Sequence, residues 1–234
     1  MDELPLKDIK LVKARYLKNL SSFGHDQKSL GWGEKGRQLE RFKILIEILN
    51  ISKRHLFSIN DIGAGFGDLY NFLIEQGYNI KSYQGYELVK ELCEQGNLAY
   101  GSRKNFKLFE GDFLEKYTNE KINTQDYSLM SGIFNFKIKN GSNYEYIESV
   151  LKASFNTSSI GIAANFITNR VDYLDEIIFN ADPARIIDIA YNISRRFVID
   201  HSYFPFEFSL AILKDQSFDE NYPVFNDKRI QYLK

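Results

Sequence analysis

The sequence predicts an α/β fold: a seven-stranded, mostly parallel sheet with helices on both faces, a C-terminal antiparallel hairpin and an N-terminal helical extension. Two observations predict the parallel sheet. Short apolar runs alternate with helical periodicity between residues 56 and 213, and the first run ends in a glycine cluster. A third observation predicts the hairpin: the connection between the last two runs is too short for a crossover helix, so they pair antiparallel.

The first fifty residues have a helical pattern that a loop interrupts. Apolar residues recur three or four positions apart over residues 1–20, which predicts an amphipathic helix. Glycines at positions 31, 33 and 36 then indicate a loop. Beyond it, Leu39, Phe42 and Ile46 resume helical spacing. The loop at residues 25–33 is a candidate lid over a binding crevice.

Residues 56–214 form the predicted core of a single domain that covers residues 1–234, with the N-terminal helices and lid loop at 1–50 and a C-terminal tail at 215–234. Gly77 closes one predicted helix as a C-cap, and Asp182 followed by Pro183 opens another. We predict strands at residues 56–62, 80–87, 106–109, 127–131, 160–167, 197–200 and 206–213, and helices at 69–76, 89–100, 144–155 and 183–193.

Composition excludes several classes of protein. Lys and Arg number 30 against 31 Asp and Glu, whereas a nucleic-acid binder usually carries a basic excess, so we expect no nucleic-acid partner. The longest apolar stretch, residues 161–167, is too short to span a bilayer, and the charged N-terminus lacks a signal-peptide core. One cysteine, Cys93, and three scattered histidines predict neither a disulfide framework nor a metal site. We therefore expect a cytoplasmic protein.

The glycine cluster lies where the first predicted strand meets the first core helix, in the sequence Asp61-Ile-Gly-Ala-Gly-Phe-Gly-Asp68. Glycines there permit positive φ and let a ligand approach the backbone closely. The Gly-x-Gly-x-Gly spacing differs from the Gly-x-Gly-x-x-Gly that holds a dinucleotide pyrophosphate. Asp61, two positions before the cluster, suits an ammonium group better than a phosphate.

These residues resemble motif I of the class I S-adenosylmethionine-dependent methyltransferases, a family with a Rossmann-like seven-stranded sheet and a C-terminal hairpin. The resemblance implies that the methionine part of the cofactor meets Asp61, Gly63, Ala64, Gly65, Gly67 and Asp68. Glu87, at the end of the second strand and next to Leu88, is placed to bind the ribose hydroxyls. A solvated charge at the strand end is the alternative for Glu87.

Two later sequence segments resemble motifs of the same family. Gly111, Asp112 and Phe113 follow the third strand and resemble the site that binds the adenine ring. The segment Asp126–Asn135 resembles motif IV, which would place Ser131 and Gly132 beside the transferred methyl group. A Pro-Pro-aromatic sequence, usual after this strand in nucleic-acid amino methyltransferases, does not occur here, nor does a cysteine nucleophile.

The Gly31-Trp-Gly33 segment and the following helix resemble a subgroup of these methyltransferases that has such a segment before motif I. Trp32 is a candidate for stacking on a ring of the cofactor or substrate, or equally an anchor for the N-terminal segment. Arg41 is a candidate partner of the cofactor carboxylate, although an arginine on a helix usually faces solvent.

Residues for the methyl acceptor are expected at the carboxyl ends of the strands. His201 is the candidate general base because its ordinary pKa lies near neutrality, with Tyr203 and Asn135 as further catalytic candidates. A structural histidine at the hairpin turn is the alternative. Glu207 alternates with apolar neighbours and is either a substrate contact or solvent-facing. The candidate substrate contacts are His25, Phe134, Tyr173 and Glu207.

The sequence therefore predicts an enzyme that transfers a methyl group from S-adenosyl-L-methionine to an oxygen or nitrogen of a small-molecule or sugar-like acceptor, leaving S-adenosyl-L-homocysteine. Aromatic residues make up 15% of the chain, and several fall at expected strand ends, which favours a ring-shaped acceptor. The alternatives are a non-catalytic module that binds the same cofactor and, disfavoured by the glycine spacing, an NAD(P)-dependent oxidoreductase.

Overall fold

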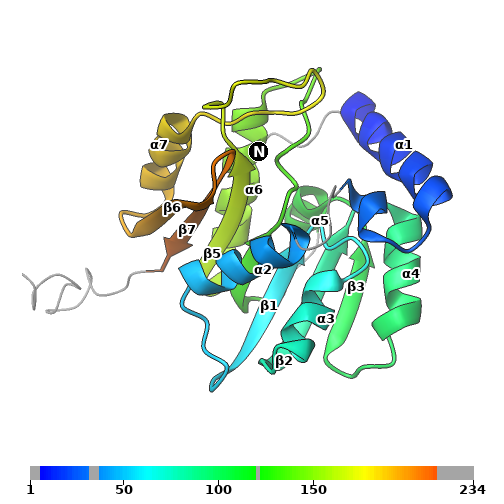
Figure 1. Ribbon diagram of the computed structural model, residues 1–234. Coiled ribbons are helices and arrows are strands. Elements are labelled where there is room, and N and C mark those ends of the chain that lie inside the picture. Colours follow the sequence, from blue (N-terminus) through cyan, green and yellow to red (C-terminus); the bar gives the residue numbers. More distant parts are fainter. Residues whose placement is uncertain (1–5, 32–36, 120–121, 215–234) are drawn as a thin grey trace, which may run out of the picture.

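One seven-stranded sheet organises the protein (Figure 1). The computed structural model describes residues 6–31, 37–119 and 122–214. Within them the strand order is β3-β2-β1-β4-β5-β7-β6. The strands are β1 (Leu56–Ile62), β2 (Asn79–Glu87), β3 (Phe106–Glu110), β4 (Gln125–Met130), β5 (Ser158–Ile167), β6 (Phe197–Phe204) and β7 (Glu207–Leu213).

Strands β1 to β5 pair in parallel, and β7 runs antiparallel between β5 and β6. The predicted mostly parallel sheet with a C-terminal antiparallel hairpin is thereby confirmed. Because β7 lies between two other strands, both of its backbone edges are paired, and the residues from Glu207 to Ile212 are buried. The hairpin therefore belongs to the core of the sheet rather than to its edge.

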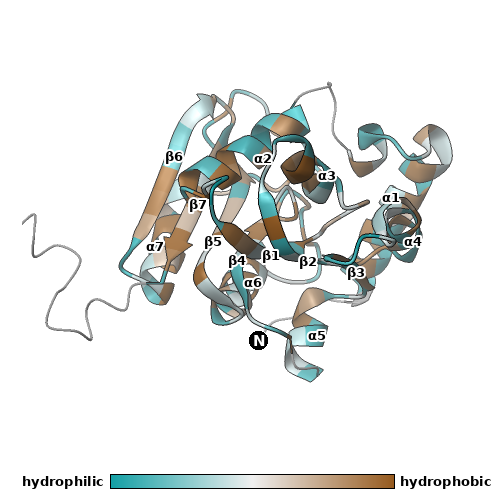
Figure 2. Ribbon diagram, turned by 90° about the horizontal axis from the view of Figure 1, so that it is seen from below, coloured by the Kyte–Doolittle hydropathy of each residue, from teal (hydrophilic) through white to brown (hydrophobic). Residues whose placement is uncertain are grey.

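Helices cover both faces of the sheet. The α-helices are α1 (Leu6–Phe23), α2 (Arg37–Ile48), α3 (Asp68–Glu75), α4 (Lys90–Tyr100), α5 (Phe113–Asn119), α6 (Asn143–Asn156) and α7 (Pro183–Ile193), with a short 3-10 helix η1 (Gln27–Leu30) after α1. Figure 2 shows the sheet edge-on between α2 and α3 on one side and α5 and α6 on the other. The α/β layering expected from the alternating pattern is thus observed.

The strands supply two cores because successive side chains point to opposite faces. On β5, Ala163 packs under α2 and α3, whereas Ile162 and Ala164 pack against α6 and α7. Buried side chains on both faces explain why the parallel strands read as continuous apolar runs in the sequence.

Two elements differ from the sequence prediction. Helix α5 begins directly at Phe113, where Asp112 caps it by accepting hydrogen bonds from the backbone N–H groups of Leu114 (2.9 Å) and Glu115 (3.0 Å). It is too short for its periodicity to stand out in the sequence. Strand β6 continues to Phe204, past a register irregularity between Asp200 and Phe204. That irregularity determines which face of the sheet each β6 side chain occupies.

The N-terminal helix α1 is held against the core at two places. Tyr16 and Leu20 pack on a small cluster formed by Phe66, Val89 and Leu92. Nearer its start, the fully buried carboxylate of Asp8 accepts hydrogen bonds from the backbone of residues 139 (2.9 Å) and 140 (3.0 Å). The predicted N-terminal helix therefore spans the molecule from α4 to the segment before α6. No helix in the described ranges combines the length and hydropathy that crossing a bilayer requires.

Candidate active site

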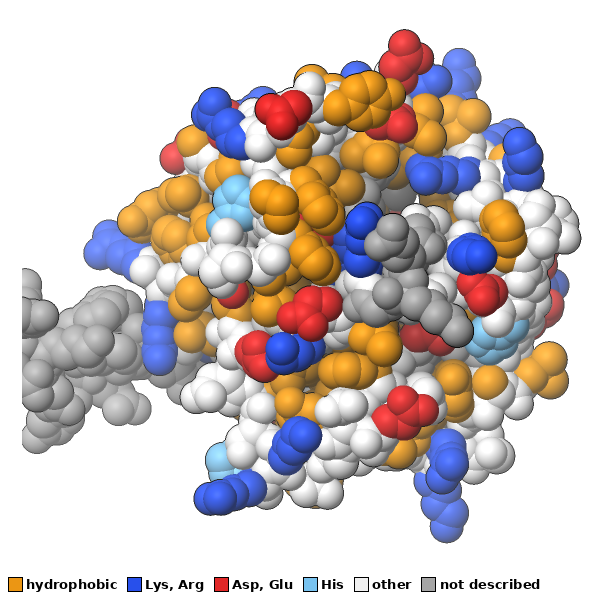
Figure 3. Space-filling view, in the orientation of Figure 1, with side chains coloured by type: hydrophobic (Ala, Val, Ile, Leu, Met, Phe, Trp, Pro, Cys, Tyr) orange, Lys and Arg blue, Asp and Glu red, His pale blue; other side chains and the backbone are white. Residues whose placement is uncertain are grey.

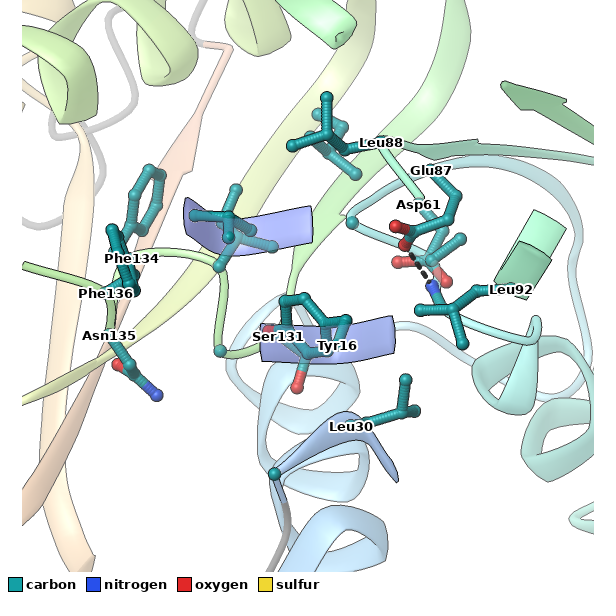
Figure 4. Close-up of a pocket in the computed structure, with 18 of the residues that line it drawn as sticks. Tyr16, Leu30, Asp61, Glu87, Leu88, Leu92, Ser131, Phe134, Asn135 and Phe136 are labelled. Atoms are coloured by element: carbon teal, nitrogen blue, oxygen red, sulfur yellow. Dashed lines mark hydrogen bonds between the residues drawn. The ribbon is translucent and has the colours of Figure 1, made fainter. Parts of the chain in front are cut away.

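A cavity of about 350 Å³ lies at the carboxyl ends of β1, β2 and β4. Figure 4 shows Asp61 and Glu87 on one side of it and Phe134, Asn135 and Phe136 on the other. We call the first side the cofactor end, lined by Asp61, Gly63, Ala64, Gly65, Glu87, Leu88, Gly111, Asp112 and Phe113. We call the second the acceptor end, lined by Phe134, Asn135, Phe136, Ile138, Ile178 and Phe206. Ser131 and Gly132 also line the cavity.

The turn after β1 needs its glycines. Gly63, Gly65 and Gly67 all have positive φ, at 74°, 57° and 85°. A Cβ on Gly63 would come within 2.2 Å of the Ile133 side chain, and one on Gly65 within 3.0 Å of Leu30. The turn thus presents bare backbone to the cavity, as close approach of a ligand requires.

Asp61 is buried at the end of β1, where it accepts a hydrogen bond from the Tyr83 hydroxyl. Burial raises the pKa of Asp61 to about 7, although the Tyr83 hydrogen bond favours the charged form. A buried carboxylate without a cationic partner is costly, and a ligand ammonium would relieve that cost. The residue expected to meet the amino group of the cofactor is therefore electrostatically prepared for a cation.

Glu87 ties the end of β2 to the glycine turn. Its carboxylate accepts hydrogen bonds from the backbone N–H groups of Gly65 (2.8 Å) and Val89 (2.7 Å). Burial raises the pKa of Glu87, and these backbone donors oppose the rise. The alternative reading of Glu87 as a solvated charge is wrong, because only 6% of the residue is exposed. A carboxylate held in this way can still accept from two ligand hydroxyls.

The third motif segment, Gly111 to Phe113, lines the cavity between the end of β3 and the start of α5. The carboxylate of Asp112 caps α5 and is 8% exposed. Gly111 has φ 123°, a conformation that side-chain-bearing residues avoid. The cap and the glycine fix the short chain segment that the resemblance assigns to the adenine ring.

The fourth motif segment, the loop after β4, contains two buried side-chain oxygens that lack a hydrogen-bond partner among the described residues. Among the described residues, Ser131 Oγ and Asn135 Oδ1 are buried and have no hydrogen-bond partner. The same loop is anchored by backbone contacts: Gly132 N donates to Asn165 Oδ1 (2.7 Å), and Asn135 O accepts from Phe179 N (3.0 Å). Buried polar atoms normally find partners, so both oxygens fit a site completed by a ligand donor.

Arg41 and Glu207, predicted separately as a cofactor contact and a substrate contact, are partners of each other. Arg41 Nε lies 2.7 Å and 2.8 Å from the two Glu207 carboxylate oxygens, and Arg41 Nη2 also donates to Glu207. Arg41 lines the cavity, whereas Glu207, its partner, does not. The solvent-facing readings are wrong for both residues, which are 5% and 0% exposed.

Several other predicted site residues do not line the cavity. His201 is exposed on β6 with the Phe208 ring as its aromatic neighbour, and the hydroxyl of Tyr203 shares a hydrogen bond with Ser209 (2.8 Å). Tyr173 is 81% exposed. His25 stacks on Phe66 with ring centroids 4.0 Å apart.

Gly67 and Asp68 lie one turn beyond the cavity wall, and the Asp68 carboxylate accepts from Gln38 Nε2 (3.2 Å). Trp32 lies outside the described residues. Two residues of the candidate lid loop at residues 25–33, Leu30 and Gly31, line the cavity.

The cavity also includes residues that sequence reasoning missed. Val12, Arg15 and Tyr16 of α1 line it, as do Arg37 and Gln38 of α2. The spacing of apolar residues in these two segments predicted amphipathic helices. It did not indicate that the helices lie over the carboxyl ends of the strands. Asn165 supports the site from β5, and its signal was available: it is the one polar residue within the apolar run Ile162–Ile167. Within the described ranges, no group of three His, Cys, Asp or Glu residues could hold a metal ion.

Comparison with known proteins agrees with this geometry. No family model matches the chain. A Mycobacterium tuberculosis protein whose name assigns it provisionally to the methyltransferases is 29% identical over 164 residues, covering 68% of this chain and 93% of that protein. A ribosomal RNA small subunit methyltransferase A of Borreliella afzelii is 35% identical over 79 residues, which are 34% of this chain and 26% of that enzyme.

Two solved structures share the fold. Magnesium protoporphyrin IX methyltransferase from Synechocystis, with bound S-adenosylmethionine, superposes with a TM-score of 0.63 at 12% identity, covering 91% of this chain and all of that one. An S-adenosylmethionine-dependent methyltransferase from Clostridium acetobutylicum has a TM-score of 0.56 at 11% identity, covering 84% and 98%. At such identities the likeness is one of fold.

The protein shares a Rossmann-like fold with solved S-adenosylmethionine-dependent methyltransferases, and residues of the four sequence motifs line one cavity. Together with the Mycobacterium tuberculosis relative, this arrangement makes the chain similar to the class I S-adenosylmethionine-dependent methyltransferases.

Proposed function

We propose that this methyltransferase acts on an oxygen or nitrogen atom of a small molecule that carries an apolar ring. The observation that supports the proposal most strongly is the continuity of one cavity. Its cofactor end contains the motif residues Asp61, Glu87 and Asp112, and its acceptor end is walled by Phe134 and Phe136. An enclosed pocket of apolar walls with a few polar atoms is typical of small-molecule sites.

The cofactor end fits S-adenosylmethionine in shape and in charge. The turn from Gly63 to Gly65 has no side chain larger than the methyl group of Ala64 and lines the cavity, and Asp61 supplies a carboxylate for the ammonium group of the methionine part. The roles that we propose for Glu87 and Phe113, which both line the cavity, are to bind the ribose hydroxyls and the adenine ring. When bound, the cofactor supplies a methyl group on a positively charged sulfur, so the leaving group is already activated.

The acceptor end is formed by segments that are distant in sequence. Phe136 pairs with Ile178 in an isolated antiparallel bridge, which joins the loop after β4 to the segment before α7. Phe206 enters from the β6–β7 turn, where the Arg37 guanidinium lies 5.6 Å from its ring centroid. A planar apolar ring can stack on such walls.

Asn135 is the polar residue that best suits the reacting group of the methyl acceptor. Its unpartnered Oδ1 can accept a hydrogen bond from a substrate hydroxyl or amine and so direct the lone pair of the nucleophile. An amide is not basic, so the role we propose for Asn135 is orientation. Orientation and proximity are the main contributions that a protein makes to methyl transfer.

Calorimetric titration with S-adenosylmethionine, S-adenosylhomocysteine and NAD tests the cofactor assignment. We expect both sulfur ligands to bind and Asp61→Asn to weaken that binding. Asp188→Asn, an exposed change on α7, is the matched control and should have no effect. Binding of NAD with no binding of either sulfur ligand would identify an oxidoreductase instead.

Transfer of radiolabelled methyl groups to a panel of acceptors tests the substrate class. The panel should contain ring-bearing hydroxyl and amine compounds, sugars and ribosomal RNA fragments, because one relative is named for ribosomal RNA. Labelling of the RNA alone would reject the small-molecule proposal. Tight cofactor binding without labelling of any acceptor would favour a non-catalytic module. The absence of a nucleic-acid partner and a cytoplasmic location both stay predictions of the sequence.

A further inference from the structure

A line of buried polar contacts connects helix α2 to the loop that separates the two ends of the cavity. Arg41 on α2 donates to Glu207 at the start of β7. Glu207 Oε1 accepts from Asn165 Nδ2 on β5 (2.8 Å), and Asn165 Oδ1 accepts from Gly132 N (2.7 Å). The three residues are 5%, 0% and 1% exposed. We call them the Arg41–Glu207–Asn165 network.

The chemistry of Glu207 sets the orientation of Asn165. An ionised carboxylate only accepts hydrogen bonds, so Asn165 must turn its NH₂ group toward Glu207. Its carbonyl oxygen then points to the opposite side, where it meets the N–H of Gly132. The guanidinium of Arg41 donates to both carboxylate oxygens of Glu207 from the other side. Each member therefore determines the direction of the next, and the last one holds the backbone of the loop.

Stability alone does not account for a buried ion pair at this place. Desolvation offsets much of the attraction between buried charges, and apolar residues of similar volume often stabilise a protein as well. The surrounding strands are apolar, with Phe166, Phe208 and Leu210 all buried. The network is thus a polar path through an apolar layer. It ends at Gly132, in the same loop as the side-chain oxygens of Ser131 and Asn135 that have no partner in the part of the chain that the structure describes.

We propose that the Arg41–Glu207–Asn165 network is a positioning device that fixes the loop at residues 131–135 relative to the cofactor. The inference rests on the proposed function, because the loop is held where that function places the reacting atoms. None of the three residues needs to touch them: the network sets the position of Asn135, and Asn135 orients the methyl acceptor. A displacement of about 1 Å at such a place costs on the order of 100-fold in rate.

The first test compares Asn165→Ala with Asn60→Ala. Asn60 is a fully buried asparagine on β1 that hydrogen-bonds Ser128 and Thr157, so it is a matched control outside the network. In Asn165→Ala we expect faster amide hydrogen exchange across residues 131–135 and a fall in kcat of roughly 10- to 100-fold. The dissociation constant of S-adenosylmethionine should change less than about threefold, because the glycine turn and Glu87 are untouched. Asn60→Ala should leave exchange in this loop and kcat as in the parent.

The second test moves the charge along the network without changing its total. Glu207→Gln alone leaves Arg41 without a carboxylate, and we expect the loop to exchange faster. In the double variant Asn165→Asp/Glu207→Gln, the new carboxylate accepts from Gly132 N and from the new amide, whose oxygen accepts from Arg41. We expect the double variant to recover loop protection and at least part of kcat. A structural role alone would track folding stability and give no such recovery in kcat.

The two proposals fail in different ways. If the parent protein methylates no acceptor, the proposed function fails, while hydrogen exchange still tests the network. If Asn165→Ala folds with the parent's loop exchange and kcat, the positioning role is rejected whatever the substrate proves to be. If Asn165→Ala does not fold, the double variant decides: unrestored loop protection in a folded double variant also rejects the role.

Discussion

At the scale of the residue, we propose that ionisation of Asp61 controls binding of the cofactor. Burial raises its pKa to about 7, so near neutral pH a substantial fraction of the ligand-free protein carries a proton on this carboxyl. An ammonium group binds the ionised form, and binding must therefore expel that proton. The ionised fraction falls as the pH drops below 7, and the affinity for S-adenosylmethionine falls with it.

We predict that the dissociation constant of S-adenosylmethionine rises between pH 7 and pH 6, approaching about tenfold per pH unit well below the pKa. Calorimetry in buffers of different ionisation enthalpy should detect release of about half a proton at pH 7. Asp61→Asn should bind more weakly and lose the dependence below pH 7. An unchanged slope in that variant would assign the titration to another group.

The prediction for the acceptor end concerns the ring of Phe136. Removal of its ring in Phe136→Ala takes away apolar contact area worth about 1.5–3 kcal/mol, or roughly 10- to 100-fold in binding of a ring-bearing acceptor. We expect the KM for that acceptor to rise while the affinity for S-adenosylmethionine stays unchanged. Phe72→Ala, at a partly buried ring on α3 outside the cavity, is the control. Equal effects on both ligands would argue against separate ends.

Helix α1 depends on a single carboxylate for its attachment to the segment before α6. Burial raises the pKa of Asp8, but the N–H donors of Lys139 and Asn140 lower it by more, so the folded value lies below the ordinary 3.8. The attachment is therefore present above pH 3.8 and is lost as the pH falls through the lower folded value. Because Val12 and Tyr16 line the cavity, the attachment also completes the wall of the cofactor site.

We predict that Asp8→Ala destabilises the docking of α1 by about 1–3 kcal/mol, because two backbone N–H groups lose their partner. Hydrogen exchange over residues 6–23 should accelerate, and the affinity for S-adenosylmethionine should fall. Lys10→Ala, an exposed change on the same helix, should alter neither quantity. Faster exchange in both variants would point to general fraying of the helix.

At the scale of elements, the sequence predicted most of the fold because its signals are local. Strand β1 and the glycine turn were predictable since a short apolar run ends at Gly63, where the backbone requires positive φ. Asp61 and Glu87 meet in one cavity because parallel strands end at the same edge of the sheet. Helix α5 was missed because it is short and its capping residue, Asp112, was interpreted only as part of a binding loop.

Side-chain positions and contacts that depend on the register between distant strands could not be predicted from the sequence. His201 was a reasonable base by its chemistry, but the irregularity between Asp200 and Phe204 leaves it exposed on the last strand of the sheet. Arg41 and Glu207 are 166 positions apart, and their pairing depends on β7 lying next to β5. A shift of one residue in a strand turns its side chains to the opposite face, and alternation along one strand cannot reveal such a shift.

At the scale of the whole molecule, the buried pair of Arg41 and Glu207 joins α2 to β7. We predict that Arg41→Met, which leaves Glu207 buried without its partner, lowers the free energy of unfolding by about 3–5 kcal/mol. The double variant Arg41→Met/Glu207→Leu should recover most of this loss, because an apolar pair needs no desolvation. Urea denaturation of both variants and the parent measures the coupling. Additive losses would show that the two side chains act independently.

The place of β7 in the sheet also has a consequence for synthesis of the protein. A ribosome adds about 5–20 residues per second, so Glu207 follows Arg41 by roughly 10 to 30 s. By the end of that interval strands β1 to β5 have been synthesised, but the strand that pairs with β5 has not, and Arg41 still lacks the carboxylate of Glu207. The residues that line the cofactor end are therefore synthesised before Glu207. A chain that stops before β7 leaves the apolar edge of β5 exposed to chaperones and proteases.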